Sequence, residues 1–440
     1  MLKLKNTSRN LKPLDTVEFS SDQNGKLVLR DGKARPYHEQ DFEKSAKIQV
    51  SGALGTHVAQ ILDSDGHVTE ETTFNVDCQT SILDKGEKFK GLFDMLYYTL
   101  HTWGEGATTI WVDGKFYKFF VCWLRDHVHT LKGMKYFEGD IKTGIELYAD
   151  TQQPNGMIWD RHEDKGPYTD WRDFTFAYGG FTTVASDGVR RFERIPVEND
   201  VEYLFLEGLY YTWKATGDDE WMMQYLDNAL KAVEYSTTDP YRWSEKYQLL
   251  KRGYTIDTWD FQSHDDIIMT GGAMCVDKDK SYFGVMHGDN TGMIAGLRYL
   301  AEMLEVAGRD AKAKKMSKLA DGLKKRLDEV SWNGEFYTHH VPEKPNPNRD
   351  LGNTPEDRQV SLSNAYALNR GLTQEQCKAI IETYQRIREE MPDSSPGEFY
   401  QIYPIFEKGF GDHGSYWEYM NGGVTTIVAG ELAHGAFEHG

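Results

Sequence analysis

The sequence predicts a mainly α-helical protein: an (α/α)6 toroid of helical hairpins preceded by a small N-terminal β region. Three observations support this fold class. β-Forming residues gather between Gly, Asp and Asn turns only at the start of the chain. The helical segments that follow come in pairs joined by short turns, which makes the two members of a pair antiparallel neighbours. Long loops rich in glycine and aromatic residues separate the pairs.

We expect two domains, a small antiparallel β region over residues 1–85 and a helical domain over residues 86–440. In the first, KLVLRDG, KIQVSG, HVAQILDSDG and TTFNVD alternate or bunch β-forming residues between turn residues. Early in the second, ATTIWVDGKFYKFFV predicts a strand hairpin around Asp113-Gly114.

The remaining segments predict helices. NDVEYLFLEGLYYTWKATGD has Asn199 as an N-cap and Gly217 as a stop, and DEWMMQYLDNALKAVEYS follows after a very short turn. The other expected helical segments are 87–103 and 124–152, the pair 291–310 and 311–332, the pair 359–371 and 373–391, and the pair 397–409 and 419–439. These make about five hairpins. A sixth would lie in the irregular stretch 240–285 or beyond the end of the chain.

Charge and hydropathy exclude several partners. The formal net charge of −19 argues against nucleic acid and anionic membrane surfaces, because both are bound through Lys and Arg. No apolar run is long enough to span a bilayer, and the N-terminus lacks the apolar segment of a signal peptide. We therefore expect a cytoplasmic protein, or a periplasmic one if a leader has been trimmed from the chain.

The cysteines predict free, mostly buried thiols. Cys78, Cys122, Cys275 and Cys377 are far apart and form no CxxC pair, so neither a zinc site nor a disulfide framework is indicated. No HExxH, Walker A or strand–GxGxxG–helix motif is present, and we expect no metal and no organic cofactor. Aromatic residues are abundant at 13%, which suits either a large core or the ring faces that line sugar sites.

The first candidate motif is VCWLRDHVHTLKGMKYF, which marks a helix start with Trp123, Arg125, Asp126 and His129. An adjacent Arg-Asp pair offers a fork of donors beside an acceptor, which suits neighbouring sugar hydroxyls. The alternative is that Asp126 caps the helix and Arg125 is its salt-bridge partner.

Two further groups stand near turns or helix starts. In QPNGMIWDR, Trp159 and Asp160 emerge from a Pro-Asn-Gly turn, either as site residues or as part of an ordinary loop with a packed Trp. His287-Gly288-Asp289 would suit a Ser/His/Asp set, but no GxSxG elbow accompanies it.

The segment GYTIDTWDFQSHDD places Asp257 and Asp260 on either side of Trp259 in a non-helical stretch. A glycosidase needs one carboxylic acid that stays protonated near neutral pH, and an aromatic neighbour raises a carboxyl pKa by excluding water. The alternative is an exposed acidic loop.

The segment GDHGSYWEYMNGG places Glu418 between Trp417 and Tyr419 in a glycine-rich turn before the last expected helix. A charge between two aromatic rings is an unusual place for a solvated side chain, and such a Glu could activate water as a general base. The alternative is a plain helix N-terminus with Asn421 as its cap.

Together, WLRD, the helix 199–218, the helix 359–371 and WEYMNGG resemble six-hairpin (α/α)6 glycoside hydrolases over roughly residues 86–440. The bacterial amylo-α-1,6-glucosidases of the glycogen-debranching type are the most similar, with glucoamylase, trehalases and processing α-glucosidases more distant. The resemblance implies that residues 86–440 are a catalytic domain that needs no cofactor. It also implies that an oligosaccharide or polysaccharide is the substrate.

Site roles follow from the same resemblance. Arg125 and Asp126 would grip hydroxyls of the terminal sugar, and TWDF resembles the Gly-Trp-Asp segment of trehalases with Thr258 in place of Gly. Asp260 would then be the general acid, with Asp257 in reserve, and Glu418 the general base of an inverting reaction. The predicted substrate-binding residues are Trp123, Arg125, Asp126, His129, Trp159, Asp160, Trp259, Trp417 and Asn421.

We expect an exo-acting glycosidase with an α-glucoside-like substrate. Three alternatives stay open: a disaccharide phosphorylase, in which phosphate replaces water; a polysaccharide lyase, in which Tyr or His abstracts a proton next to a uronate carboxylate; and a non-catalytic glycan-binding relative.

Overall fold

The computed structural model describes most of the chain. The described residues are 1–5, 10–12, 15–32, 34–50, 54–76, 85–86, 89, 91–92, 109–112, 115–136, 138, 140–164, 182–184, 190–259, 276–345, 350–352, 354–411 and 414–440. Asp260 and the predicted helix 87–103, apart from residues 89 and 91–92, lie outside this part of the chain, as do Cys78 and Cys275.

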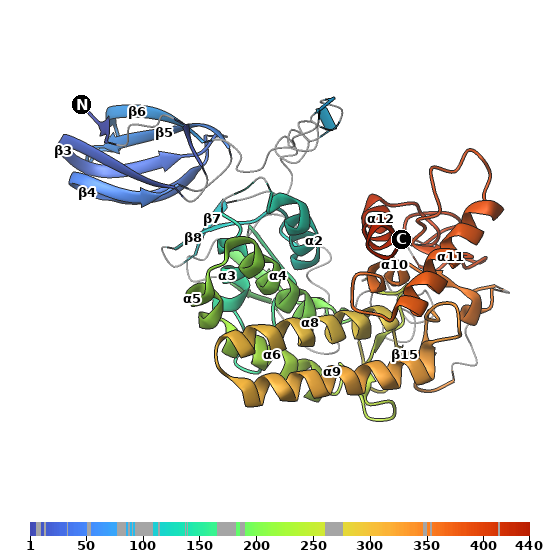
Figure 1. The fold of residues 1–440 in the computed structure, drawn as a ribbon. Coiled ribbons are helices and arrows are strands. Elements are labelled where there is room, and N and C mark those ends of the chain that lie inside the picture. The colour runs from blue at the N-terminus through green and yellow to red at the C-terminus, as the bar shows by residue number, and fades with distance from the viewer. Residues whose placement is uncertain are drawn as a thin grey trace.

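The predicted β region is confirmed as a six-stranded sheet (Figure 1). Its strands are β1 (Lys3–Leu4), β2 (Asn10–Leu11), β3 (Thr16–Arg30), β4 (Pro36–Gln49), β5 (Gly55–Leu62) and β6 (Val68–Val76). All pairs are antiparallel except β2 with β6. The sheet has its own apolar core, which includes Phe19, Leu27, Ile61 and Phe74. The domain boundary at residue 85 stays a prediction.

The rest of the chain is mainly helical, as predicted. The described helices are α2 (Leu124–Met134), α3 (Thr143–Asp150), α4 (Val201–Thr216), α5 (Asp219–Gln224), α6 (Leu226–Thr238), α8 (His287–Val306), α9 (Asp310–Ser331), α10 (Ser363–Ala367), α11 (Gln374–Glu390) and α12 (Thr426–His439). Helices α8 and α9 form the longest of the predicted hairpins (Figure 1). Among the described residues, no helix combines the length and apolarity needed to cross a bilayer.

Five of the described helices form a closed inner ring. Helix α2 packs on α4, α4 on α8, α8 on α10 and α10 on α12. The ring closes because Lys132 of α2 reaches Glu431 of α12, with 2.6 Å between Nζ and Oε1. The same ammonium group lies 2.8 Å from Glu207 of α4, so one partly buried cation joins three helices of the ring.

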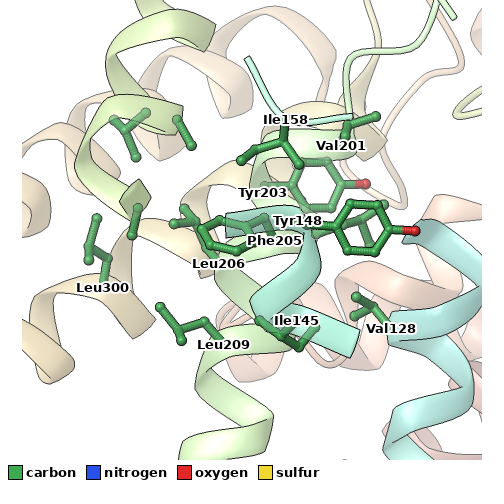
Figure 2. Close-up of a cluster of buried hydrophobic side chains, with 14 of the residues drawn as sticks. Val128, Ile145, Tyr148, Ile158, Val201, Tyr203, Phe205, Leu206, Leu209 and Leu300 are labelled. Atoms are coloured by element: carbon green, nitrogen blue, oxygen red, sulfur yellow. The ribbon is translucent and has the colours of Figure 1, made fainter. Parts of the chain in front are cut away.

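Apolar side chains fill the space between the helices. Figure 2 shows one such cluster, whose labelled side chains come from α2, α3, α4 and α8 and, with Ile158, from the loop that follows α3. Glycines let the helices come close: a Cβ on Gly208 would lie 2.6 Å from Ile145, and one on Gly292 would lie 2.3 Å from the Tyr203 ring. Gly217 ends α4 in the left-handed conformation that the sequence predicted for a stop.

Short strands occupy the loops between helices. They are β7 (Thr109–Val112) and β8 (Lys115–Lys118), β9 (Arg161–Asp164), β10 (Thr182–Val184) and β11 (Arg190–Glu193), β12 (Trp243–Ser244) and β13 (Leu249–Leu250), β14 (Arg252–Gly253), β15 (Phe283–Val285) and β16 (Val341–Pro342), and β17 (Val360–Ser361) and β18 (Ile402–Tyr403). The β7–β8 pair confirms the hairpin predicted around residues 113–114.

Three local predictions are wrong. Residues 397–409 do not form a helix, because Ile402 and Tyr403 pair with β17 in strand β18. The last helix begins at Thr426, not near residue 419. Asn199 does not cap α4; Asp200 occupies that position, and the Asn199 amide donates instead to the carbonyls of Arg242 and Lys251.

Of the four cysteines, the structure describes Cys122 and Cys377, and neither forms a disulfide. Cys377 is buried, as predicted, and Cys122 is half-buried.

Candidate active site

The N-terminal ends of the inner helices meet at one end of the ring. Arg125, at the start of α2, binds Asp200, which immediately precedes α4. His287, the first residue of α8, lies 2.8 Å from the hydroxyl of Ser361, two residues before α10. Side chains from segments that are far apart in the sequence therefore converge here, which is the geometry a site between helical hairpins requires.

Arg125 is held by two carboxylates of the segment before α4. Its Nε lies 2.6 Å from Asp200 Oδ2 and its Nη2 lies 2.9 Å from Glu198 Oε1. Asp126 is exposed and makes no capping hydrogen bond, so the alternative of a local Arg125–Asp126 pair is wrong. The guanidinium, which the prediction assigned to sugar hydroxyls, instead fixes two carboxylates at the site.

Asp160 and Glu198 form a buried acidic pair beside Arg125. Both are about 1% exposed. Burial raises the pKa of Asp160 well above its usual value, and the neighbouring Glu198 raises it further. Both effects favour the protonated, uncharged form of Asp160.

Asp289, in the first turn of α8, is a second carboxyl with a raised pKa. Burial raises its pKa to about 7, although Arg252 at 3.1 Å acts in the opposite direction. Arg252 also donates a 2.7 Å hydrogen bond to the carbonyl of Trp259. Arg252, which is buried, therefore contacts both Asp289 and the segment that immediately precedes Asp260 in the sequence.

Asp257 is fully buried and firmly held as a carboxylate. Its Oδ2 accepts a 2.9 Å hydrogen bond from the Ser363 amide, and its Oδ1 accepts one of 2.8 Å from the Ser363 hydroxyl. Burial acts to raise the pKa of Asp257, but His287, the Ser361 side chain and the Ser363 amide outweigh it and leave the pKa below its usual value. A general acid must be protonated, so the structure argues against Asp257 in the reserve role predicted for it.

Trp259 brings the predicted acid segment to the predicted base segment. Its ring lies 4.8 Å from the ring of Tyr419, centroid to centroid. Trp259 precedes Asp260 in the sequence and Tyr419 follows Glu418. Two segments separated by about 160 residues therefore meet at residues that are adjacent in sequence to the two predicted catalytic residues.

Residues 414–421, which we call the aromatic loop, present Glu418 to solvent. Glu418 is exposed, and its Oε2 accepts a 3.3 Å hydrogen bond from the Ser415 amide. Its neighbours are large exposed rings: Tyr416 is 65% exposed, Trp417 42% and Tyr419 43%. The loop thus offers a carboxylate with access to water beside ring faces that a sugar can pack on.

Backbone strain is concentrated at these two segments. Six described residues other than glycine have a left-handed φ, and three of them are Asp257 at 46°, Trp417 at 58° and Tyr419 at 38°. Each such residue costs about 1–3 kcal/mol and persists only where the surroundings enforce it. Strain of this kind collects at functional sites, so it marks the Asp257–Trp259 segment and the aromatic loop.

Gln401 joins the two segments through hydrogen bonds. Its side-chain oxygen accepts a 2.8 Å hydrogen bond from Trp259 Nε1, and its amide nitrogen donates one of 2.7 Å to the Thr425 hydroxyl, just after the aromatic loop. Its backbone N–H donates to the carbonyl of Gly423. Because Gln401 is fully buried, these bonds fix Trp259 relative to the loop.

Asn421 has a structural role, which contradicts its prediction as a substrate-binding residue. It is fully buried. Its Oδ1 accepts from the Phe406 amide at 2.8 Å, and its Nδ2 donates to the carbonyls of Phe406 and Gly414 at 2.9 Å. These bonds hold the two ends of the aromatic loop together. Because its side chain is used in this way, Asn421 neither caps a helix nor is available to bind substrate.

His129 lies away from this cluster, inside the ring. Its Nδ1 is 3.5 Å from Glu431, and its ring stacks on Tyr366 with 5.2 Å between centroids. It lines a cavity of about 460 Å³ between α2 and α12, and the described lining of this cavity includes none of the other predicted site residues. Among the described residues, His129 therefore shares no cavity with Glu418.

The two upstream tryptophans differ from each other. Trp159 is 3% exposed and packs in the helical core, with its indole N–H donating to the Thr151 carbonyl, so its predicted contact with substrate is not supported. Trp123 is half-buried, and the Arg161 guanidinium covers its ring at 4.5 Å.

The sequence did not predict that Glu198, Asp200, Arg252 and Asp289 would gather at this end of the ring. A signal was present for two of them, because Asp200 and Asp289 stand at the starts of strongly apolar helices. Nothing in a single sequence indicated that Arg125 and Arg252 would pair with these acids, 75 and 37 positions away.

No protein-family model matches the chain, and no curated protein is similar to it. Solved structures are similar over most of its length. A rhamnosidase from Klebsiella oxytoca with rhamnose bound is 14% identical over 86% of this chain and 72% of that one, with a TM-score of 0.43. A GH63 mannosylglycerate hydrolase from Thermus thermophilus in complex with glucose is 14% identical over 79% and 86%, with a TM-score of 0.47.

A bacterial glucoamylase complexed with acarbose is 12% identical over 94% of this chain and 67% of that one, with a TM-score of 0.42. At TM-scores of 0.42 to 0.47, these likenesses give no residue of this chain a role.

Proposed function

We propose that the chain is a glycoside hydrolase that inverts the anomeric centre, with Asp260 as general acid and Glu418 as general base. The observation that carries the proposal is the contact between Trp259 and Tyr419, 4.8 Å apart, each adjacent in sequence to one of the two acids. Gln401, which is buried and bonded to both segments, supports a fixed relation between them.

In this reaction Asp260 donates its proton to the glycosidic oxygen as the bond from that oxygen to the anomeric carbon breaks. Glu418 removes a proton from a water molecule that attacks the anomeric carbon from the opposite face. The product sugar therefore has the inverted configuration. An inverting pair needs carboxyl groups about 6.5–9.5 Å apart, which leaves room for that water.

The residue that precedes Asp260 in the sequence and the exposure of Glu418 suit different roles for the two acids. Asp260 follows a half-buried tryptophan, and an apolar neighbour favours the protonated form that a general acid needs. Glu418 is exposed on the aromatic loop, where the water molecule that a general base activates can reach it.

The substrate class follows from the surroundings of Glu418. The exposed rings of Tyr416, Trp417 and Tyr419 suit an oligosaccharide, because sugar C–H groups pack on aromatic faces. Asp126, exposed beside the buried Arg125 cluster, remains the predicted acceptor for hydroxyls of the terminal sugar. An exo-acting reaction on an α-glucoside-like oligosaccharide stays the favoured version.

The test uses the full chain with aryl glycosides and oligosaccharides, and follows the anomer of the product by NMR. The expected result is turnover with inverted product. Asp260→Asn and Glu418→Gln should each lower kcat by about 10²–10⁴-fold. Asp321→Asn, an exposed acid on α9, is the matched control and should leave kcat unchanged.

Other outcomes would contradict the proposal. A retained anomeric configuration would reject inversion, and full activity of Asp260→Asn would reject the assigned acid. In that second case, loss of activity in Asp289→Asn would move the proton donor to the carboxyl whose pKa is about 7. Turnover that requires phosphate would indicate a phosphorylase, and an unsaturated product a lyase. Glycan binding without turnover would indicate a binding protein.

A further inference from the structure

A basic cleft lies beside the short strands β12, β13, β15 and β16, apart from the residues assigned to catalysis. Its volume is about 610 Å³, within the range of about 300–1,000 Å³ usual for small-molecule sites. Five lysines line it: Lys246, Lys251, Lys278, Lys280 and Lys344. They come from three loops that are distant in the sequence.

This concentration of positive charge runs against the rest of the chain. The whole sequence has 69 acidic and 50 basic residues, whereas the cleft has five lysines and three acids. The acids are Glu245, Asp279 and Glu343. A positive region on a protein of net charge −19 attracts anions locally while the remaining surface repels them.

The lysines are not all neutralised by the acids. Glu343 is already bound, since its Oε1 accepts a 2.5 Å hydrogen bond from the Ser244 hydroxyl and its Oε2 lies 3.2 Å from Lys251. Lys246 donates to the backbone carbonyl of Glu343 and not to a carboxylate. In the described part of the chain, Lys278 and Lys344 form no ion pair, and both are exposed.

Aromatic residues form the wall between the lysines. Trp243 is half-buried, and Tyr282 and Phe283 are 7% and 8% exposed. Rigid rings beside mobile ammonium groups suit a ligand with an apolar face and an anionic substituent.

We propose that this cleft binds a saccharide that carries a phosphate or sulfate ester. The cations among its described lining residues are all lysines, whose ammonium groups bind phosphate and sulfate oxygens as point charges. The aromatic wall would hold the sugar ring. The proposal does not depend on the hydrolytic reaction, because none of its residues belongs to the proposed catalytic machinery.

The experiment measures binding to the full chain by calorimetry at low ionic strength. The probes are glucose 6-phosphate, glucose 6-sulfate, glucose and inorganic phosphate. We expect one or both esters to bind at least about tenfold more tightly than glucose or inorganic phosphate, with an affinity that falls as salt is added. The better of the two esters identifies the anion.

The Lys246→Gln, Lys278→Gln, Lys344→Gln triple variant should weaken ester binding about tenfold or more. The matched control replaces three exposed lysines of α9, Lys314, Lys315 and Lys318, with Gln and changes the net charge equally. An equal loss in both variants, or no loss in the first, would overturn the proposal. Tighter binding of a short single-stranded oligonucleotide than of either ester, abolished in the first variant, would also overturn it.

Discussion

At the scale of single residues, Asp257 and Asp289 are both fully buried, yet their pKa values shift in opposite directions. Asp257 receives two hydrogen bonds from Ser363 and faces His287, which together stabilise its charge. Burial raises the pKa of Asp289 most. Arg252 and Arg125 act against this, whereas the neighbouring Asp200 and Asp257 oppose its ionisation. The number of donors that reach each carboxyl decides which form it keeps.

The raised pKa of Asp289 predicts a specific dependence of stability on pH. The unfolded carboxyl ionises above about pH 4, whereas the folded one stays protonated to about pH 7. Folding therefore takes up a proton in this window, and the free energy of unfolding should decrease as pH rises through it, by roughly 1 kcal/mol per pH unit. Urea unfolding of Asp289→Asn should show a flatter profile between about pH 4 and 7. Parallel profiles for the two proteins would refute the assignment.

Asp257 predicts the opposite trend. In Asp257→Asn, an amide N–H would face the Ser363 donors, which should cost about 1–3 kcal/mol of unfolding free energy at neutral pH. Because the folded pKa is lowered, the advantage of the parent protein should vanish as pH falls below about 4. The exposed control Asp321→Asn should change stability by less than about 0.5 kcal/mol. A constant difference at all pH values would contradict the charged state of Asp257.

At the scale of elements, the sequence predicted the helix ends and turns that depend on residues close to them in the chain. The helix ending at Gly217 and the hairpin around residues 113–114 follow from stop and turn residues within a few positions. Residues 397–409 were predicted wrongly because strand β18 depends on pairing with β17, about 40 positions earlier. Asn421 resembled a cap, but its partners are Phe406, which precedes the aromatic loop, and Gly414, the first residue of that loop.

The link made by Gln401 predicts an effect on activity that exceeds its effect on stability. In Gln401→Leu, Trp259 Nε1 and the Thr425 hydroxyl lose their buried partner, at a cost of about 1–3 kcal/mol in unfolding free energy. If the link aligns acid and base, kcat should fall by about 10²-fold with a smaller change in KM, as misplacements near 1 Å do.

Gln359→Leu is the matched control for this experiment. Gln359 is equally buried and precedes β17 as Gln401 precedes β18, but it bonds to the Pro404 carbonyl and touches neither segment. Kinetics and urea unfolding should show similar destabilisation in both variants and a fall in kcat only in Gln401→Leu. Equal kinetics would mean that Gln401 has only a structural role.

At the scale of the molecule, a partly buried cation links three helices of the ring. Lys132 joins α2, α4 and α12 through Glu207 and Glu431. Lys132→Met leaves two buried carboxylates without it, which should cost about 3–5 kcal/mol of unfolding free energy. The control Lys214→Met removes an exposed pair with Glu302 and should cost less than about 1 kcal/mol. Urea unfolding measures both, and equal losses would mean that the partly buried cation does not hold the ring together.

The site itself was only partly predictable. The sequence indicated the segments around Trp259 and Glu418 because aromatic residues and acids stand together in turns. It gave no sign that Arg125 would be bound by Asp200 and Glu198, since that contact forms only when α2 and α4 pack side by side. Partners within a turn can be predicted from spacing, whereas partners across the ring require the fold.

The gathering of helix N-termini at one end of the ring has an electrostatic consequence. Each helix carries about half a positive charge at its N-terminus from its aligned peptide dipoles. Helices α2, α4 and α8 direct this potential toward Asp200 and Asp289. The positive potential of the helix backbones therefore offsets negative charge on these carboxyl groups that the neighbouring cationic side chains do not fully balance. An acidic chain of this kind can keep carboxyl groups in its interior at a lower cost than their burial alone would impose.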